Sequence, residues 1–491
     1  MSNLPKGWIE TSIGEIAIYV QRGKSPQYTS FSDLVVINQK CVRWHGLEKE
    51  HVKFVHREQW QSWDEERHLK DGDILWNSTG TGTIGRACIY KQTYFSTAVV
   101  DSHVTIIRFN QNYIFPTYVF YFIASPLVQK KIESMQSGST NQVELGRAAI
   151  NEMRLPLPPL NEQKRIVAKI EELFSKLDSA IESLKTARAQ LKLYRQAVLK
   201  HAFEGKLTAE WRERNKDKLE SAEQILERVP SHRCINVDSV TQAEFEKLPK
   251  LPTSWRYARL GYFIEAVNAG KSFKCDEREP RQDEVGVAKV SAVTWGEYDE
   301  HESKTCIDSV KINPDLFIRP GDFLFSRANT IDLVGACVIA KTATKHIMLS
   351  DKTLRIQFRD LEPYYFLYYL RSQMGRNEIM QRSTGNQESM RNIGQDRIRN
   401  IIIPICSPRE AIQIKQELRE KFTILDNLAA VIDIELQKSE ALRQSVLKKA
   451  FSGQLVPQNP ADEPASVLLE RIRAEKIVTK SIPQKTKRRV A

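Results

Sequence analysis

Most of the recognisable sequence in this chain occurs twice, about half a chain apart. Residues 4–8 read Leu-Pro-Lys-Gly-Trp, and residues 251–255 read Leu-Pro-Thr-Ser-Trp. Residues 195–203, Arg-Gln-Ala-Val-Leu-Lys-His-Ala-Phe, return at 443–451 as Arg-Gln-Ser-Val-Leu-Lys-Lys-Ala-Phe. Two long copies of one unit tend to pack about a local two-fold axis. A single chain built in this way suits a target that itself has two parts.

The composition is that of a globular protein with several domains. The chain has 491 residues, of which 41% are apolar and 27% charged. No run of about 18 uninterrupted apolar residues occurs and the N-terminus lacks a signal-peptide core, which predicts a cytoplasmic protein. Seven cysteines without a Cys-x-x-Cys pair argue against a disulfide framework and a zinc ribbon.

The net charge indicates a polyanionic partner. Lysine and arginine number 73 against 61 aspartate and glutamate, which gives a formal charge of +12. The alternative is a basic protein that binds no polyanion, and charge alone does not name the partner.

Each copy divides into a mixed segment followed by a long helix. Residues 1–155 and 248–403 carry short strand-like runs, turn residues and one aromatic helix-like stretch, which predicts two α+β domains. A proline cluster at 156–159 ends the first domain and begins a helical segment predicted over 156–208, with its counterpart over 404–456. We predict a charged connector at 209–247 and a partly disordered tail at 457–491.

Both helical segments carry an apolar seam with alternating steps of four and three residues, which is typical of a coiled coil. The seam of the first also includes Ala180, Ala187, Tyr194 and Val198, and that of the second is interrupted at Lys421, Glu435 and Ser439. The predicted spacer positions are Ile166, Ile170, Leu173, Leu177, Leu184, Leu191, Ile414, Leu418, Leu425, Leu428, Ile432, Leu442 and Val446. The simplest partner for each helix is the other one, and a coil between chains is the alternative. Periodicity leaves open whether the helices run parallel or antiparallel.

The motifs that would indicate catalysis are incomplete. Residues 80–85 satisfy Gly-x-Gly-x-x-Gly, but the stretch that follows leaves little room for the helix that a dinucleotide site requires. The Gly-Lys-Ser sequences at 23–25 and 270–272 lack the earlier glycine of a P-loop, and we interpret their lysines as part of a basic recognition surface. His103 and His346 have no metal ligand at suitable spacing, so no metal site is predicted. The chain alone is therefore expected to be non-catalytic.

These paired domains and paired seams resemble the specificity subunit of a type I restriction-modification enzyme. The strongest matches are residues 156–167, 194–199 and 203–208, with second-copy counterparts at 403–410, 442–447 and 451–455. The resemblance covers nearly the whole chain. The second copy departs from the first by having Cys406 and Ser407 where the first has Pro158 and Pro159.

The resemblance implies a fold and a division of labour. The fold would be α+β, with two tandem target recognition domains separated by two long helices that form an antiparallel coiled coil. Each domain would read one half of a bipartite asymmetric site in double-stranded DNA. Two modification subunits using S-adenosylmethionine would methylate adenine N6, and restriction subunits using ATP and Mg would cleave. No cofactor bound by this chain itself is expected.

Within each domain, polar loop residues at matching positions are the candidates for DNA contact, because Arg and Lys address guanine or phosphate and Asn and Gln address adenine. The alternative is that many of them only satisfy turns. In the first domain they are Arg22, Lys24, Ser25, Asn77, Ser78, Thr79, Thr81, Thr83, Arg86, Ser137, Ser139, Thr140, Asn141 and Gln142. In the second they are Lys271, Ser272, Lys274, Arg327, Asn329, Thr330, Arg382, Ser383, Thr384, Asn386 and Gln387.

Overall fold

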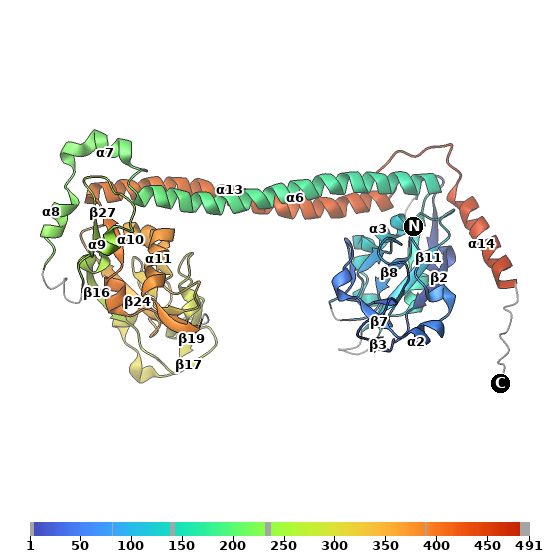
Figure 1. The fold of residues 1–491 in the computed structure, drawn as a ribbon, viewed down its shortest axis with the longest axis horizontal. Coiled ribbons are helices and arrows are strands. Elements are labelled where there is room, and N and C mark those ends of the chain that lie inside the picture. Colours follow the sequence, from blue (N-terminus) through green and yellow to red (C-terminus); the bar gives the residue numbers. More distant parts are fainter. Residues whose placement is uncertain (1–3, 81, 138–142, 231–236, 388–389, 482–491) are drawn as a thin grey trace. The chain divides into compact units, whose positions relative to one another are not determined.

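The computed structural model describes residues 4–80, 82–137, 143–230, 237–387 and 390–481, and the chain divides into two compact units. The first unit comprises Met1–Lys185 and Asp433–Ala491, and the second comprises Thr186–Ile432. Each unit therefore contains one recognition domain together with one half of each long helix (Figure 1).

The first recognition domain is built on two four-stranded sheets. The first sheet is antiparallel, in the order β2 (Ala17–Arg22), β11 (Val104–Phe109), β8 (Ile74–Asn77) and β9 (Ala87–Ile89). The second runs β10 (Ala98–Val100), β4 (Val35–Ile37), β7 (Lys53–Val55) and β3 (Tyr28–Thr29), with β10 and β4 parallel. Every residue of β4, β8, β10 and β11 is buried, which accounts for their nearly continuous apolar sequences.

The second recognition domain repeats this design. Its first sheet runs β16 (Ile264–Ala269), β24 (Thr353–Phe358), β20 (Phe323–Ser326) and β22 (Cys337–Ile339). Its second runs β17 (Cys275–Asp276), β19 (Ser303–Cys306), β18 (Gly286–Ala288) and β23 (Ile347–Met348), with β18 and β23 parallel. A third sheet joins β21 (Ala328–Asn329), β26 (Met390–Asn392) and β25 (Thr384–Gln387).

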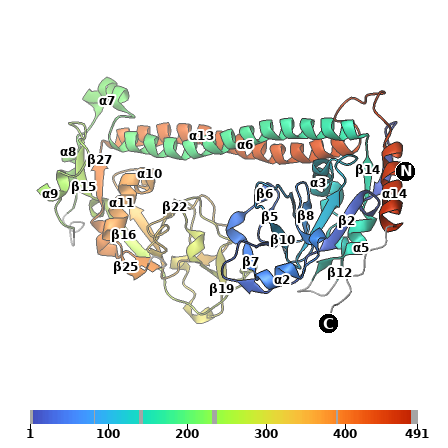
Figure 2. The ribbon, with the colours of Figure 1, turned by 45° about the vertical axis from the view of Figure 1, so that its right-hand side comes forward.

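Two 44-residue helices, α6 (Leu160–Phe203) and α13 (Pro408–Phe451), pack side by side within each unit (Figures 1 and 2). In the first unit, Arg443 near the end of α13 forms an ion pair with Asp178 of α6. In the second unit, Arg195 near the end of α6 forms an ion pair with Asp426 of α13. As the residue number rises along α6 from 178 to 195, that of the partner on α13 falls from 443 to 426, which confirms the predicted antiparallel coiled coil within one chain.

Eleven predicted spacer residues are buried or half-buried, and two are not. Leu428 is 47% exposed and Leu442 is 52% exposed. Along α6 the seam also leaves the predicted positions, because Ala180 is exposed and Ile181 is half-buried instead. The predicted positions that follow, such as Leu184, Ile432 and Val446, are again buried or half-buried, so the seam departs from the predicted heptad at single positions and does not drift away from it.

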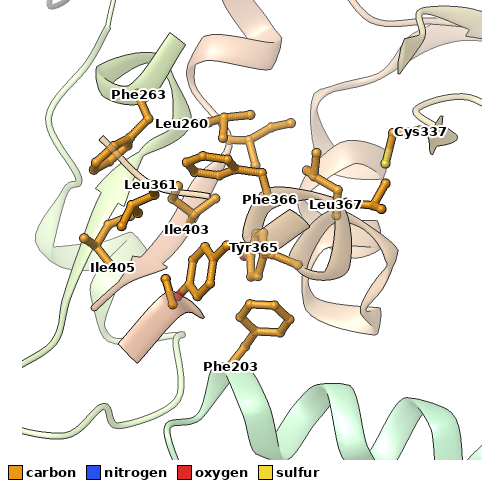
Figure 3. Close-up of a cluster of buried hydrophobic side chains, with 14 of the residues drawn as sticks. Phe203, Leu260, Phe263, Cys337, Leu361, Tyr365, Phe366, Leu367, Ile403 and Ile405 are labelled. Carbon is orange, nitrogen blue, oxygen red and sulfur yellow. The ribbon is translucent and has the colours of Figure 1, made fainter. Parts of the chain in front are cut away.

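The end of each long helix packs into the core of a recognition domain. Phe203 lies edge-on to Tyr365 and Tyr369, with ring centroids 5.3 and 5.1 Å away. Figure 3 shows Phe203 pointing from α6 toward Tyr365, within a cluster of buried side chains from the second domain. In the first unit, Phe451 lies in the same way against Tyr118 and Phe122. The duplicated Phe motif is therefore an anchor between helix and domain.

A glycine follows each anchor two residues later, and both glycines have a left-handed backbone. Gly205 has φ +71°, and a Cβ added there would lie 2.5 Å from the Pro252 ring. Gly453 has φ +72°, and a Cβ added there would lie 2.2 Å from the Pro5 ring.

We expect Gly205→Ala to lower the free energy of unfolding by at least about 1–2 kcal/mol, because non-glycine residues are strained in this conformation. Urea unfolding would measure this. Gly394→Ala is the control, since Gly394 has nothing within 4 Å and a negative φ; an equal loss in both variants would contradict the prediction.

The predicted tail contains a helix. Helix α14 (Ala465–Ser481) packs on the first domain through buried Leu469 and Ile472, and Arg473 forms an ion pair with Glu15. The backbone NH of Ala465 donates to the carbonyl of Gly7. The connector between α6 and the second recognition domain, which lies within the second unit, repeats this contact through α8 (Ala222–Glu227), where the NH of Ala222 donates to the carbonyl of Ser254.

Within the described residues, no helix is long and apolar enough to cross a membrane. The same residues include no group of three or more His, Cys, Asp or Glu side chains that could hold a metal ion.

Candidate nucleic-acid interface

Loops that are distant in sequence meet at one end of the first domain. Thr79, just beyond β8, forms a bridge with Glu144 of β13 (Glu144–Leu145). Arg22, at the end of β2, forms an ion pair with Glu144 and donates from Nε to the carbonyl of Ser102 at 2.8 Å. The hydroxyl of Thr79 lies 2.6 Å from Nδ1 of His103. The predicted positions Arg22 and Thr79 therefore lie in one polar cluster, together with Glu144, which the sequence did not single out.

The second domain builds the matching cluster from different side chains. Asn329 of β21 pairs with Arg391 of β26, and the NH of Ile393 donates to the carbonyl of Arg327 at 2.9 Å. The NH of Arg327 donates to the carbonyl of Lys352, just as the NH of Ser78 donates to that of His103 in the first domain. Residues 327 and 352 of the second domain are thus the structural counterparts of residues 78 and 103 of the first.

The two Gly-Lys-Ser motifs occupy tight crossings in these clusters. A Cβ on Gly23 would lie 2.1 Å from the carbonyl oxygen of Asp101, and one on Gly270 would lie 2.1 Å from that of Leu349. Glycine is required because the two chain segments approach so closely. The lysines that follow, Lys24 and Lys271, are exposed. These motifs shape a basic surface rather than a phosphate-cradling loop.

The Gly-x-Gly-x-x-Gly sequence also lies in this cluster. Residues 80–85 link β8 to β9, which pair as antiparallel neighbours. A dinucleotide site would need a helix directly after these glycines, and β9 occupies that place instead. The interpretation of residues 80–85 as a loop agrees with this connection.

In each domain an ion pair with a buried arginine lies at the opposite end of the same two central strands. Arg108 of β11 binds Asp73 at 2.7 Å, and Arg355 of β24 binds Asp322 at 3.1 Å. Burial raises the pKa of Asp73, and its hydrogen bonds from Arg108 oppose that shift. Each arginine also donates to backbone carbonyls of the segment that precedes the neighbouring strand, β8 or β20. Arg108, for example, donates to the carbonyl of His68 at 2.7 Å. This explains why a Gly-Asp motif recurs at 72–73 and 321–322.

The structure places the predicted first-domain residues in three groups. The exposed or half-buried ones are Arg22, Lys24, Ser25, Thr79, Thr83 and Arg86. Thr81, Ser139, Thr140, Asn141 and Gln142 lie outside the described residues, as does the side chain of Ser137. Asn77 and Ser78 were predicted to face DNA, but both have no exposed surface. Asn77 donates to the carbonyl of Gln39 at 3.0 Å, and Ser78 bonds to Thr105, so these two side chains hold the loop in place.

In the second domain most predicted residues reach the surface. Lys271, Ser272, Lys274, Thr330, Thr384 and Gln387 are exposed, and Arg327 and Asn329 are half-buried. The side chain of Asn386 lies outside the described residues. Ser383 is buried, and Arg382 donates to the carbonyl of Asn400 at 2.9 Å and pairs with Glu378 at 2.8 Å. Arg382 and Ser383 therefore fasten the hairpin that carries the following exposed residues.

A lysine-lined cavity of about 660 Å³ lies at the second cluster. Its walls include the predicted Lys271, Ser272 and Asn329, and three lysines that the sequence did not single out, which are Lys289, Lys304 and Lys352. Two acidic residues, Glu277 and Asp351, also line it, so the wall is net positive. Ammonium groups suit phosphates, and the neighbouring amide and hydroxyl groups suit base edges. The missed lysines lie on or beside strands, and only the sheet order brings them together.

Both domains thus carry a loop-built polar cluster at corresponding places of the same sheet order. A family model described as the type I restriction modification DNA specificity domain matches residues 5–193. In sequence the chain is similar to the specificity subunits of type I restriction enzymes, both in this segment and over most of its length.

Relatives of known kind match over most of the chain. The EcoEI specificity subunit of Escherichia coli is 26% identical over 512 residues, which span 90% of this chain and 83% of the relative. The EcoKI specificity subunit of Escherichia coli strain K12 is 27% identical over 380 residues, or 74% of this chain and 72% of the relative. Both relatives are named as specificity subunits of restriction enzymes.

Solved structures share the fold. A chain from a type I restriction-modification system, reported for its complex assembly and conformational transition, superposes with a TM-score of 0.64 at 18% identity, covering 92% of this chain and 99% of that one. The HsdS subunit from Thermoanaerobacter tengcongensis superposes with a TM-score of 0.54 at 18% identity, covering 92% and 98%.

The interface predicts how single substitutions act on DNA binding. We expect Lys24→Ala and Arg327→Ala each to weaken binding, and the loss of one phosphate contact lowers the slope of log affinity against log salt by about one unit. A base contact would instead relax one position of the recognised sequence, at about 1–3 kcal/mol. Fluorescence anisotropy at several salt concentrations distinguishes the loss of a phosphate contact from the loss of a base contact.

Lys91→Ala is the matched control for these variants. Lys91 is exposed and follows β9, at the opposite end of that strand from Arg86. If affinity, salt slope and sequence preference were unchanged in both Lys24→Ala and Arg327→Ala, the two loops would not contact DNA.

Proposed function

We propose that this subunit recognises a bipartite, asymmetric DNA sequence, with one half read by each recognition domain, and thereby directs adenine-N6 methylation or cleavage by partner subunits. The observation that carries the proposal is the repeated cluster, built once in each unit on the same sheet order and the same Gly-Lys crossing. One framework used twice supplies two reading faces in one chain.

The side chains on the two faces differ, which favours an asymmetric target. Ser78 corresponds to Arg327, and His103 corresponds to Lys352. Arginine forms bidentate hydrogen bonds with guanine, whereas a buried serine reads no base. Two faces with different donors and acceptors read two different half-sequences.

The long helices offer a surface for the partner subunits. In the second unit, five apolar side chains are exposed on α6 and α13: Leu193 72%, Tyr194 53%, Ile424 59%, Leu428 47% and Val431 55%. Ile424, Leu428 and Val431 are spaced by four and three residues and so share one face of α13, and an exposed apolar face favours a protein partner. We propose that two modification subunits, which use S-adenosylmethionine, dock on the helices, and that restriction subunits, which use ATP and Mg, join them. Since cellular DNA is the target, we place this function in the cytoplasm.

Reconstitution tests the proposed function. The purified chain should neither methylate nor cut DNA, and addition of its cognate modification subunit with S-adenosylmethionine should methylate adenine within one split motif. Sequencing of the methylated DNA would identify that motif. Methylation by this chain without the partner, or methylation by the pair without sequence preference, would contradict the proposal.

A further inference from the structure

Each unit holds a pocket between its recognition domain and the helix pair, and both pockets have the same aromatic frame. In the first unit, Tyr121 lies edge-on to Phe174 at 5.8 Å, and Arg443 lies 4.3 Å above the Phe174 ring. In the second unit, Tyr368 lies edge-on to Phe422 at 5.6 Å, and Arg195 lies 4.5 Å above that ring. A tryptophan lines each pocket as well, Trp44 in the first and Trp295 in the second.

The two pockets differ in the charge of their walls. Three carboxylates line the first-unit pocket, from Glu171, Asp178 and Glu440, and Asp178 is paired with Arg443. Three arginines and no carboxylate are found among the described lining residues of the second-unit pocket: Arg195, Arg371 and Arg376. The two pockets therefore share an aromatic frame, but the wall of the first-unit pocket is acidic and the wall of the second-unit pocket is basic.

Two of these arginines are held in place without a carboxylate partner among the described residues. Arg371 donates to the carbonyl of Cys337 at 2.8 Å, and Arg376 donates to the carbonyls of Val334 and Ile331. Arg376 also lies 5.1 Å above the Trp295 ring, and burial lowers its pKa. Backbone carbonyls orient both guanidinium groups, and the only carboxylate that acts on Arg376, Asp332, does so without forming an ion pair among the described residues, which favours an additional anionic ligand.

The elements around the pocket favour a protein as the source of that anion. Its arginines come from α6, α10 (Pro363–Arg371) and α11 (Gln373–Arg382), and Phe422 comes from α13. None of these is one of the loops of the DNA-reading cluster. Two of the pocket-lining helices, α6 and α13, also carry the exposed apolar side chains proposed above as a surface for partner subunits.

We propose that the second-unit pocket receives an acidic side chain of a modification subunit, while the matched first-unit pocket disfavours the same side chain. The inference rests on the proposed function, in which two copies of one partner meet two copies of one frame. Identical partners present identical side chains, so opposite wall charges make the two docking sites unequal. The two modification subunits then bind in two steps of different affinity.

Calorimetric titration of the full chain with its cognate modification subunit tests this inference. The informative variant is Gln373→Glu, because Gln373 lines the basic pocket, is exposed, and is the first residue of α11, where a negative charge is favourable for the helix. We expect it to weaken one binding step by about tenfold or more and to leave the other unchanged. Glu171→Gln combined with Glu440→Gln should strengthen the weaker step.

Gln282→Glu is the control, since it makes the same charge change at an exposed residue outside the pocket. Two equal steps, or equal effects of Gln373→Glu on both steps, would overturn the charged-pocket inference while leaving the proposed function intact. Loss of DNA affinity rather than of subunit affinity in Gln373→Glu would assign the pocket to a phosphate and overturn it as well. A chain that binds no modification subunit would overturn the proposed function itself.

Discussion

Exchange of the first recognition domain, residues 1–155, for that of a relative should replace one half of the methylated motif and leave the other half intact. The reason is that the loops of the first cluster all come from this segment, whereas the second cluster is built entirely within Thr186–Ile432. A half-site of a few base pairs, at about 1–3 kcal/mol for each mismatch, corresponds to a change in preference of about a thousandfold or more.

The exchange must keep the contacts that anchor the domain. Phe451 packs against Tyr118 and Phe122 of α3 (Pro116–Ala124), so these two aromatic residues should be retained in the chimera. Methylome sequencing of cells that carry the chimera and the intact modification subunit gives the motif. The reciprocal exchange of residues 248–403 is the matched control and should alter the other half. If one exchange changed both halves, the modular reading of DNA would be wrong.

The duplicated motifs predicted the parts of the fold better than the way those parts combine. Trp255, for example, is one half of a repeated Leu-Pro-x-x-Trp motif, and its Nε1 donates to Glu410 at 2.9 Å, over 150 residues later. Phe203 likewise ends the helix of the first copy but packs in the domain of the second. Such pairings join residues far apart in the chain, and a single sequence carries no record of them.

The candidate interface was predictable where an exposed loop carried a glycine and a basic residue, as at Lys24 and Lys271. It was not predictable where burial decided the role of a polar residue. Asn77 and Lys352 are both polar residues beside a strand end, yet Asn77 faces inward toward the carbonyl of Gln39 and Lys352 lines a cavity. Which side of the chain a residue faces depends on the neighbouring strands, and these come from elsewhere in the sequence.

A seven-residue insertion near Leu184 in α6, combined with another near Ile432 in α13, should lengthen the unread gap between the two half-sites. Both positions lie at the boundaries between the units, so the domain contacts of each helix end are kept. Seven residues add roughly 10 Å of helix, and about three base pairs of DNA span the same length. The apolar stripe shifts by only about 20° per heptad, so the helix pair should still form.

Activity of the double-insertion variant is measured on DNA with gaps longer by zero to about four base pairs, and we expect the optimum at about three. The added base pairs also rotate the far half-site by roughly a quarter turn, so the rate should fall even at the new optimum. A variant with the insertion in α6 alone is the control, because it places the two apolar seams out of step and should destabilise the pair. A folded, active double-insertion variant that still methylates only the original gap would show that the helices do not measure the spacing.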